Sequence, residues 1–146
     1  MMQIPVILLL NLFLFQPQLM ELPDQSQSLR ATLTNKVSER RVVLLFGQRS
    51  RRFDLTVQEQ RLALWTNQLA ERDMDVIVLV NEDLNPVDRQ FLVQKFRLDP
   101  NTVFIGWLIG KDGGVKQTFT RPIDPDELCR VVDAMPMRRQ EMKKGD

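Results

Sequence analysis

Val42-Val43-Leu44-Leu45-Phe46 is an unbroken apolar run that begins with two β-branched residues. Such a run is typical of a strand buried on both faces, as in the parallel sheet of an α/β protein. Gly47 follows the run and opens a polar loop that contains Arg49, Arg51 and Arg52. We therefore predict a central strand here, with a basic loop at its carboxyl end.

Helical and strand patterns alternate after this loop. Residues 56–72 carry apolar side chains at helical spacing and begin with Thr56 and Glu59, which match a capping box. Residues 76–80 form a second apolar run, which predicts a second buried strand. A short helix is predicted over 85–97, because an N-cap asparagine is followed there by proline at the first helical position.

The last third of the chain predicts a hairpin and a helix. Residues 104–109 are apolar, whereas residues 115–119 alternate, so the second of these strands is expected to be half exposed near an edge. The segment 111–114 between them ends in two glycines and predicts a turn. A helix is predicted from an aspartate–proline start at 124–125 up to Pro136, which should end it.

The predicted order is strand, helix, strand, helix, strand–strand hairpin, helix. We expect both strand–helix–strand crossovers to be right-handed and to cover both faces of one sheet. This is the order of an α/β, thioredoxin-like β-α-β-α-β-β-α three-layer sandwich. We predict a signal peptide and linker at 1–28, a lead-in at 29–40, the thioredoxin-like domain at 41–137 and a charged C-terminal tail at 138–146.

An apolar run from Ile4 to Phe15 marks the N-terminal part of the sequence. It is shorter than the roughly 20 residues of a transmembrane helix and fits the roughly 7–15 apolar residues of a secretory signal. No Lys or Arg precedes it, and no A-x-A cleavage triplet follows it. We expect export to the periplasm or the extracellular space, with no stable membrane span after processing. An uncleaved membrane anchor and an apolar helix packed on the domain stay open as alternatives.

The composition of the 146-residue chain excludes several kinds of chemistry. The chain contains no His, no Tyr and one Cys, so Ser-His-Asp or Cys-His catalysis, a His/Cys zinc site and an intrachain disulfide are excluded. Close acidic pairs at 73–75 and 82–83 do not supply the oxygens of a calcium loop, and we predict no metal and no cofactor. The net charge of +1 argues against a nucleic-acid partner.

Three segments carry a resemblance to a known family: R-V-V-L-L-F-G at 41–47, L-I-G-K-D-G-G-V-K at 108–116 and D-A-M-P-M-R-R-Q-E-M at 133–142. Over residues 40–142 the chain resembles the family called domain of unknown function 4174. The resemblance implies a thioredoxin-like fold and occurrence in bacterial exported proteins. Related domains belong to animal extracellular proteins with sushi repeats. An oxidoreductase role is suggested for the family by fold analogy alone.

The sequence departs from redox-active relatives at the place where their thiols lie. Thioredoxins carry Cys-x-x-Cys between the first strand and the first helix, and peroxiredoxins carry a reactive Cys there, because the helix N-terminus lowers the thiol pKa. Here that segment, 47–54, contains no Cys. Pro100 is separated from the third strand by three residues, which argues against a matching cis-proline. The single Cys129 flanks the apolar stripe of the last helix. We expect it to pack in the core, with a reactive or intermolecularly paired thiol as alternatives.

Basic residues in two segments are the first candidate contact residues. Arg49, Arg51 and Arg52 precede a predicted helix N-terminus, which together with guanidinium groups attracts anions; the alternative is a solvated loop. Arg138 and Arg139 match the terminal motif of the family. They either pair with acids of the domain and fix the tail, or face a ligand or partner.

Lys111 in the hairpin turn completes the candidate anion or partner contacts. The spacing of a phosphate-binding loop is absent, so turn formation explains its two neighbouring glycines. We predict no catalytic residue. We expect an exported, non-enzymatic binding module for a protein or an envelope or matrix component. The alternative is an oxidoreductase or peroxide-handling enzyme that would use Cys129 or an unconventional site.

Overall fold

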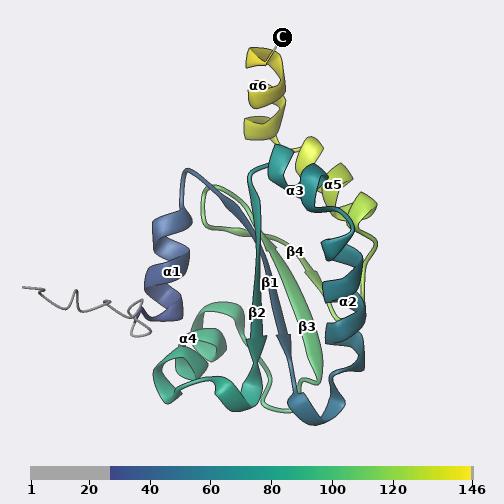
Figure 1. Ribbon diagram of the computed structural model, residues 1–146. Coiled ribbons are helices and arrows are strands. Elements are labelled where there is room, and N and C mark those ends of the chain that lie inside the picture. The colour runs from purple at the N-terminus through teal and green to yellow at the C-terminus, as the bar shows by residue number, and fades with distance from the viewer. Residues whose placement is uncertain (1–26, 146) are drawn as a thin grey trace, which may run out of the picture.

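The sheet is built around β1 (Arg41–Gly47), which contains the apolar run, in a computed structural model that describes residues 27–145. The strand order is β2-β1-β3-β4, with β2 at Met74–Val80, β3 at Phe104–Ile109 and β4 at Val115–Phe119. β2 runs parallel to β1, β3 antiparallel to β1, and β4 antiparallel to β3. Every residue of β1 is buried because the strand has a neighbour on each side and helices over both faces (Figure 1).

One face of the sheet is covered by α2 (Phe53–Ala63), α3 (Thr66–Glu71) and α5 (Pro125–Asp133). Val43 and Leu45 of β1 belong to the core on this side, as period-2 alternation requires. The helices contribute their buried side chains to the same core, among them Leu55, Leu62, Leu69, Leu128 and Val132.

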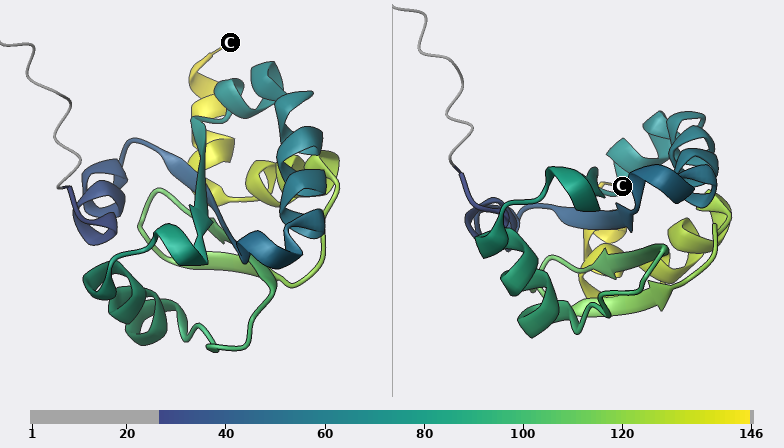
Figure 2. Two further views of the ribbon diagram at one scale, coloured as in Figure 1. Left: turned by 60° about the horizontal axis from the view of Figure 1, so that its bottom comes forward. Right: turned by 90° about the horizontal axis from the view of Figure 1, so that it is seen from below.

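The opposite face is covered by α1 (Leu29–Lys36) and α4 (Pro86–Phe96), as Figure 2 shows from two further sides. The intervening β1 side chains belong to this second core, together with Phe91, Leu92, Phe96 and Trp107. The Asn85 side chain accepts the backbone N–H of Asp88 at 2.8 Å, which confirms the predicted cap of α4. The sheet and its two covered faces form three layers, which confirms the predicted fold class.

The prediction of one helix over 56–72 with a capping box is wrong. Helix α2 begins at Phe53, and the Thr56 N–H already donates to the Arg52 carbonyl at 2.9 Å, so Thr56 is not the N-cap. The segment then breaks at Leu64 and Trp65, because Trp65 leaves helical geometry (φ −114°, ψ 23°) before α3 starts. The break turns Leu64 toward solvent while Trp65 packs against the core.

The second strand is an edge strand, not the buried strand that its apolar run predicted. β2 pairs with β1 alone, and Val76 and Val78 are exposed. The second predicted crossover is also corrected: α4 joins β2 to β3, which run in opposite directions on either side of β1. Only β1-α2/α3-β2 is a parallel crossover.

The helix predicted from 124–125 ends at Asp133, before Pro136, but the chain after it is not an irregular tail. Pro136 is the first residue of a further helix, α6 (Pro136–Lys144), because proline at this position needs no backbone N–H. The predicted solvated tail is therefore helical up to residue 144. No helix among residues 27–145 is long and apolar enough to cross a membrane. The predicted signal segment, apart from its last residues, lies outside the described part of the chain.

Candidate functional site

The loop between β1 and α2 contains the first group of candidate cations. Two one-turn helices, η1 (Arg49–Arg51) and η2 (Asn81–Asp83), lie against each other here. The Arg49 guanidinium pairs with the Asp83 carboxylate, and the backbone N–H of Arg49 donates to Glu82 Oε2 at 2.9 Å. The hydrogen bond that Arg49 donates to Asp83 raises the pKa of Arg49. This arginine therefore has an acidic partner within the domain.

The two neighbouring arginines differ from Arg49 and from each other. Arg52 pairs with Glu59 on the next turns of α2 at 3.2 Å. Arg51 is exposed and has no carboxylate within 4.0 Å among the described residues. Phe53, two residues after Arg51, is 79% exposed. The N-terminal end of α2 thus presents an exposed arginine and an exposed aromatic ring two positions apart in the sequence.

Gln48 ties this loop to the segment that precedes β3. Its backbone N–H donates to the Val103 carbonyl at 3.1 Å, and its side-chain Nε2 donates to the Thr102 carbonyl at 3.0 Å. No peptide bond between residues 27 and 145 is cis, so Pro100 is trans. The loop in which redox-active relatives are expected to carry their thiols is therefore joined to the segment before β3 by an amide.

The other candidate cations lie at the opposite end of the sheet. Lys111 is only 9% exposed, and its Nζ donates to Asp73 Oδ2 at 2.8 Å and to Glu141 Oε1 at 2.6 Å. Arg41, at the start of β1, is 1% exposed and forms a two-pronged pair with Glu141 at 3.2 Å for each prong. Its NH1 also donates to the Arg72 carbonyl at 2.9 Å. Lys111, expected as a contact residue, is thus buried and engaged by two carboxylates.

A second ion cluster fixes the start of α6. Asp133 accepts two hydrogen bonds of 2.9 Å from Arg72 and one of 3.4 Å from Arg138. Arg138 also donates to the Glu71 carbonyl at 3.0 Å. This arrangement is the one in which Arg138 pairs with acids of the domain. Arg139 is exposed and has no carboxylate partner among the described residues.

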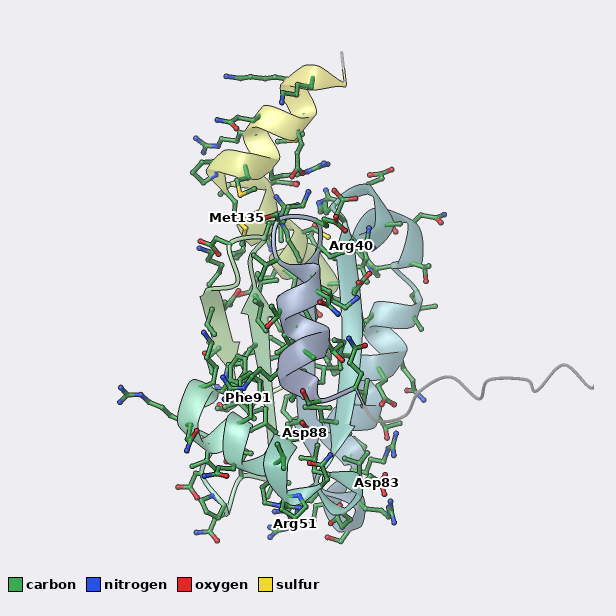
Figure 3. All side chains as sticks on the ribbon, turned by 90° about the vertical axis from the view of Figure 1, so that its left-hand side faces the viewer. Arg40, Arg51, Asp83, Asp88, Phe91 and Met135 are labelled. Carbon is green, nitrogen blue, oxygen red and sulfur yellow. The ribbon has the colours of Figure 1, made fainter. Side chains whose placement is uncertain are left out.

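The six candidate cations therefore form two groups rather than one site. Arg49, Arg51 and Arg52 lie at the carboxyl end of β1, whereas Lys111, Arg138 and Arg139 lie beyond its amino end. Figure 3 shows this separation, with Arg51 and Asp83 at one end of the molecule and Arg40 and Met135 at the other. One ligand of small size cannot contact both groups.

Cys129 lies in neither group. It is buried in the core between the sheet and α5, and burial raises the pKa of its thiol. Both effects oppose formation of a thiolate at neutral pH. The expectation that Cys129 packs in the core is therefore met by its position. Residues 27–145 contain no cluster of three or more His, Cys, Asp or Glu side chains arranged to hold a metal ion.

Sequence reasoning missed the residues that bind the cations of the second group. In the sequence, Arg41 precedes an apolar run and Glu141 lies in the predicted charged tail, and nothing local shows that the two are paired across 100 positions. Only one signal pointed to them: both lie within the segments that carry the family resemblance. Spacing along the chain does not reveal a pair that tertiary folding creates.

Several carboxyl groups, among them Asp133, Asp75 and Glu141, have lowered pKa values in the folded protein. The hydrogen bond from Arg72 lowers the pKa of Asp133, and those from Arg40 and Lys36 lower the pKa of Asp75. Burial opposes ionisation of Glu141, but the hydrogen bonds from Lys111 and Arg41 outweigh it and lower its pKa.

Acid should therefore weaken the fold. The stability contributed by these carboxylates is complete above their ordinary pKa values and is lost as the pH falls through the lowered ones. We expect the urea midpoint to be lower at pH 3 than at pH 7, with the loss concentrated below the ordinary Glu pKa of 4.5. In the Glu141→Gln variant, the urea midpoint should change less between pH 7 and pH 3 than in the wild type. A midpoint that stays constant between the two pH values would show that the ion pairs contribute nothing.

Comparison with solved structures returns peroxiredoxins. A reduced 2-Cys peroxiredoxin of Plasmodium vivax matches with a TM-score of 0.56 and 15% identity, covering 74% of this chain and 72% of that chain. Prx1a of Plasmodium yoelii matches with a TM-score of 0.55 and 16% identity, covering 78% and 82%. The mitochondrial 2-Cys peroxiredoxin of Plasmodium falciparum matches with a TM-score of 0.53 and 11% identity, covering 70% of this chain and 79% of that chain. At such identities the likeness shows the fold alone.

Comparison at the level of sequence identifies the family. No curated protein matches the chain. A family model described as a domain of unknown function, DUF4174, matches residues 32–141, a range that contains β1 and ends at Glu141. The chain therefore belongs to the DUF4174 family, with a thioredoxin-like fold, a single cysteine and no cysteine pair.

Proposed function

We propose that this chain is an exported binding module that uses a thioredoxin-like scaffold without thiol chemistry. Its partner is a protein or a component of the envelope or matrix. The observation that carries the proposal is that the loop at 47–54, where redox-active relatives carry their thiols, contains an amide and arginines but no cysteine, while Cys129 lies buried elsewhere. Export rests on the apolar run at 4–15.

The binding surface we propose is the N-terminal end of α2. Arg51 has no acidic partner among the described residues, and Phe53, two residues further along the chain, is exposed. Arginine and aromatic side chains supply much of the binding energy of protein interfaces, because they combine large contact area with directed hydrogen bonds. The ion pair between Arg49 and Asp83 holds the backbone on which Arg51 is presented.

A capture experiment tests this surface. The mature chain is immobilised and exposed to the exported fraction of its source, and bound material is identified. We expect Arg51→Ala and Phe53→Ala each to weaken capture of the same partner by tenfold or more, about 1.4 kcal/mol. Leu64→Ala is the matched control, since Leu64 is 83% exposed at the other end of α2. Repeated capture of nothing, or equal loss with Leu64→Ala, contradicts the proposal.

The thiol of Cys129 should be unreactive in the native protein. Because the side chain is buried and its pKa is raised, labelling by a thiol reagent requires unfolding. For a domain of ordinary stability we expect labelling in buffer to be at least about a thousandfold slower than in denaturant. Stopped-flow absorbance with a chromogenic disulfide measures both rates.

The reactivity of the Cys129 thiol also distinguishes the proposed binding module from its alternative, a peroxide-handling or disulfide-exchanging enzyme. That alternative is supported by the peroxiredoxin likeness of the fold. Fast native labelling, together with a peroxidase or reductase activity that Cys129→Ser abolishes, would overturn the binding module. N-terminal sequencing of the exported form tests the signal peptide independently of either outcome.

A further inference from the structure

A hollow of about 250 Å³ opens between α1 and α4, on the face of the sheet opposite α2. Its floor is apolar and comes from both helices and from the central strands: Leu33, Val37, Val42, Phe91, Phe96 and Ile109. Val42, Phe91, Phe96 and Ile109 are buried members of the second core. The floor therefore has the character of a small-molecule site, in which apolar walls provide most of the contact.

The rim of the hollow is basic. Lys36, Arg40, Arg30 and Lys95 line it, against a single acid, Asp112. Lys36 and Arg40 both pair with Asp75, at 2.5 Å and 2.6 Å, and Arg40 also pairs with Asp73 at 3.3 Å. Asp112 is engaged by Lys116 at 2.6 Å. The other two cations of the rim have no carboxylate partner among the described residues.

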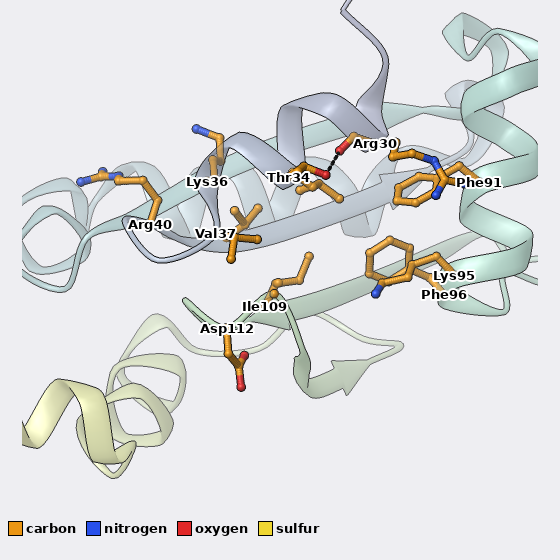
Figure 4. Close-up of a pocket in the computed structure, with 14 residues that line it drawn as sticks. Arg30, Thr34, Lys36, Val37, Arg40, Phe91, Lys95, Phe96, Ile109 and Asp112 are labelled. Carbon is orange, nitrogen blue, oxygen red and sulfur yellow. Dashed lines mark hydrogen bonds between the residues drawn. The ribbon is translucent and has the colours of Figure 1, made fainter.

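Arg30 and Lys95 are these two cations, and neither has a carboxylate within 4.0 Å among residues 27–145. The Arg30 guanidinium lies 4.7 Å from the centre of the Phe91 ring, which holds it in place without neutralising it. Figure 4 shows Arg30 and Lys95 at the same end of the hollow, beside the rings of Phe91 and Phe96. An anion bound there would lie next to an apolar floor.

We propose that this hollow binds a small monocarboxylate with an apolar tail. The carboxylate lies between Arg30 and Lys95, and the tail lies over Ile109 and Val42 toward Val37. The volume is below the roughly 300–1,000 Å³ of sites for drug-sized ligands, which limits the tail to about eight carbons. This site is separate from the α2 surface and does not rest on the proposed function.

Trp107 provides a signal for binding. Its ring lies 5.1 Å from that of Phe96, which lines the hollow, whereas Trp65 packs in the core on the other face of the sheet. In the Trp65→Phe chain, fluorescence therefore reports on Trp107 alone. Calorimetry on the unmodified chain provides a second, independent readout.

A headgroup series tests the charge preference. We expect octanoate to bind with a Kd of about 100 µM, an affinity within reach of a ligand of its size. 1-Octanol should bind at least tenfold more weakly and octylammonium more weakly still, because the free cations attract only the carboxylate. Higher salt should lower the affinity for octanoate and leave the affinity for 1-octanol unchanged. Equal affinities for octanoate and octanol would overturn the proposal.

Variants test the residues. Arg30→Ala and Lys95→Ala should each lower the affinity for octanoate about fivefold and leave the affinity for 1-octanol unchanged. Lys143→Ala on α6 is the control and should change neither affinity. Val37→Trp should block both ligands by filling the hollow. Octanoate binding that survives both Arg30→Ala and Val37→Trp overturns the site. The headgroup series uses the native hollow, so it decides the question even if a variant fails to fold. Capture of the partner at Arg51 and Phe53 should be unaffected throughout.

Discussion

Glu141→Gln is expected to lower the free energy of unfolding by about 3 kcal/mol, although Glu141 lies five residues from the end of the chain. The carboxylate neutralises two buried cations, Arg41 and Lys111. Its loss leaves the Arg41 guanidinium, 1% exposed, without an anionic partner, and an uncompensated buried charge is strongly destabilising. Urea unfolding followed by far-UV circular dichroism measures the effect.

Asp126→Asn is the matched control for this prediction. Asp126 also forms an ion pair, with Arg130 at 3.2 Å, but both side chains are exposed on α5. Loss of an exposed helical pair should cost about 0.5 kcal/mol or less. If Glu141→Gln costs no more than this control, α6 is not held by its pair with Arg41.

Gly106→Ala is expected to cost about 2–3 kcal/mol. Gly106 on β3 is paired in register with Phe119 on β4. A Cβ at Gly106 would lie 2.2 Å from two ring carbons of Phe119, so the ring would have to leave its place in the core. Thermal and urea unfolding report the loss. Gly145→Ala is the control, because a Cβ there meets only ordinary contacts at 3.8 Å or more.

A double-mutant cycle distinguishes this collision from a general intolerance of alanine at Gly106. Phe119→Ala alone should cost about 3–4 kcal/mol, since it removes a buried ring. With the ring gone, the added methyl has room, and Gly106→Ala should then cost at least about 1 kcal/mol less than in the wild-type background. Strict additivity of the two changes would show that the Phe119 ring is not what excludes a side chain.

The fold was predictable because local patterns suffice for its main elements. The run at 42–46 is apolar at every position, so only a strand buried on both faces accommodates it. The starts of α4 and α5 follow from an Asn or Asp placed before a proline, although the Asp124 side chain makes no capping hydrogen bond. The position of β2 was not predictable, because an apolar run does not show whether a strand has one neighbour or two.

The sites were less predictable than the fold, for a physical reason. The sequence does not show whether an arginine will form an ion pair with a carboxylate in the folded protein. Lys111 and Arg138 have acidic partners, whereas Arg51, in a similarly basic segment, has none among the described residues. The cations of the α1–α4 hollow were overlooked because residues 29–40 have no strong amphipathic pattern, and only the tertiary fold places Arg30 beside Phe91.

The pairing of Arg41 with Glu141 also sets a condition on how the chain is made. The two residues are separated by 100 positions, so at about 5–20 residues per second the ribosome produces the acid several seconds after the base. During that interval the sheet can assemble only with its first guanidinium hydrated. Synthesis of the segment that contains Glu141, rather than formation of the strands, is then the event that closes the fold at this end. Premature termination before codon 141 would yield a polypeptide with every strand present but vulnerable to quality-control proteases.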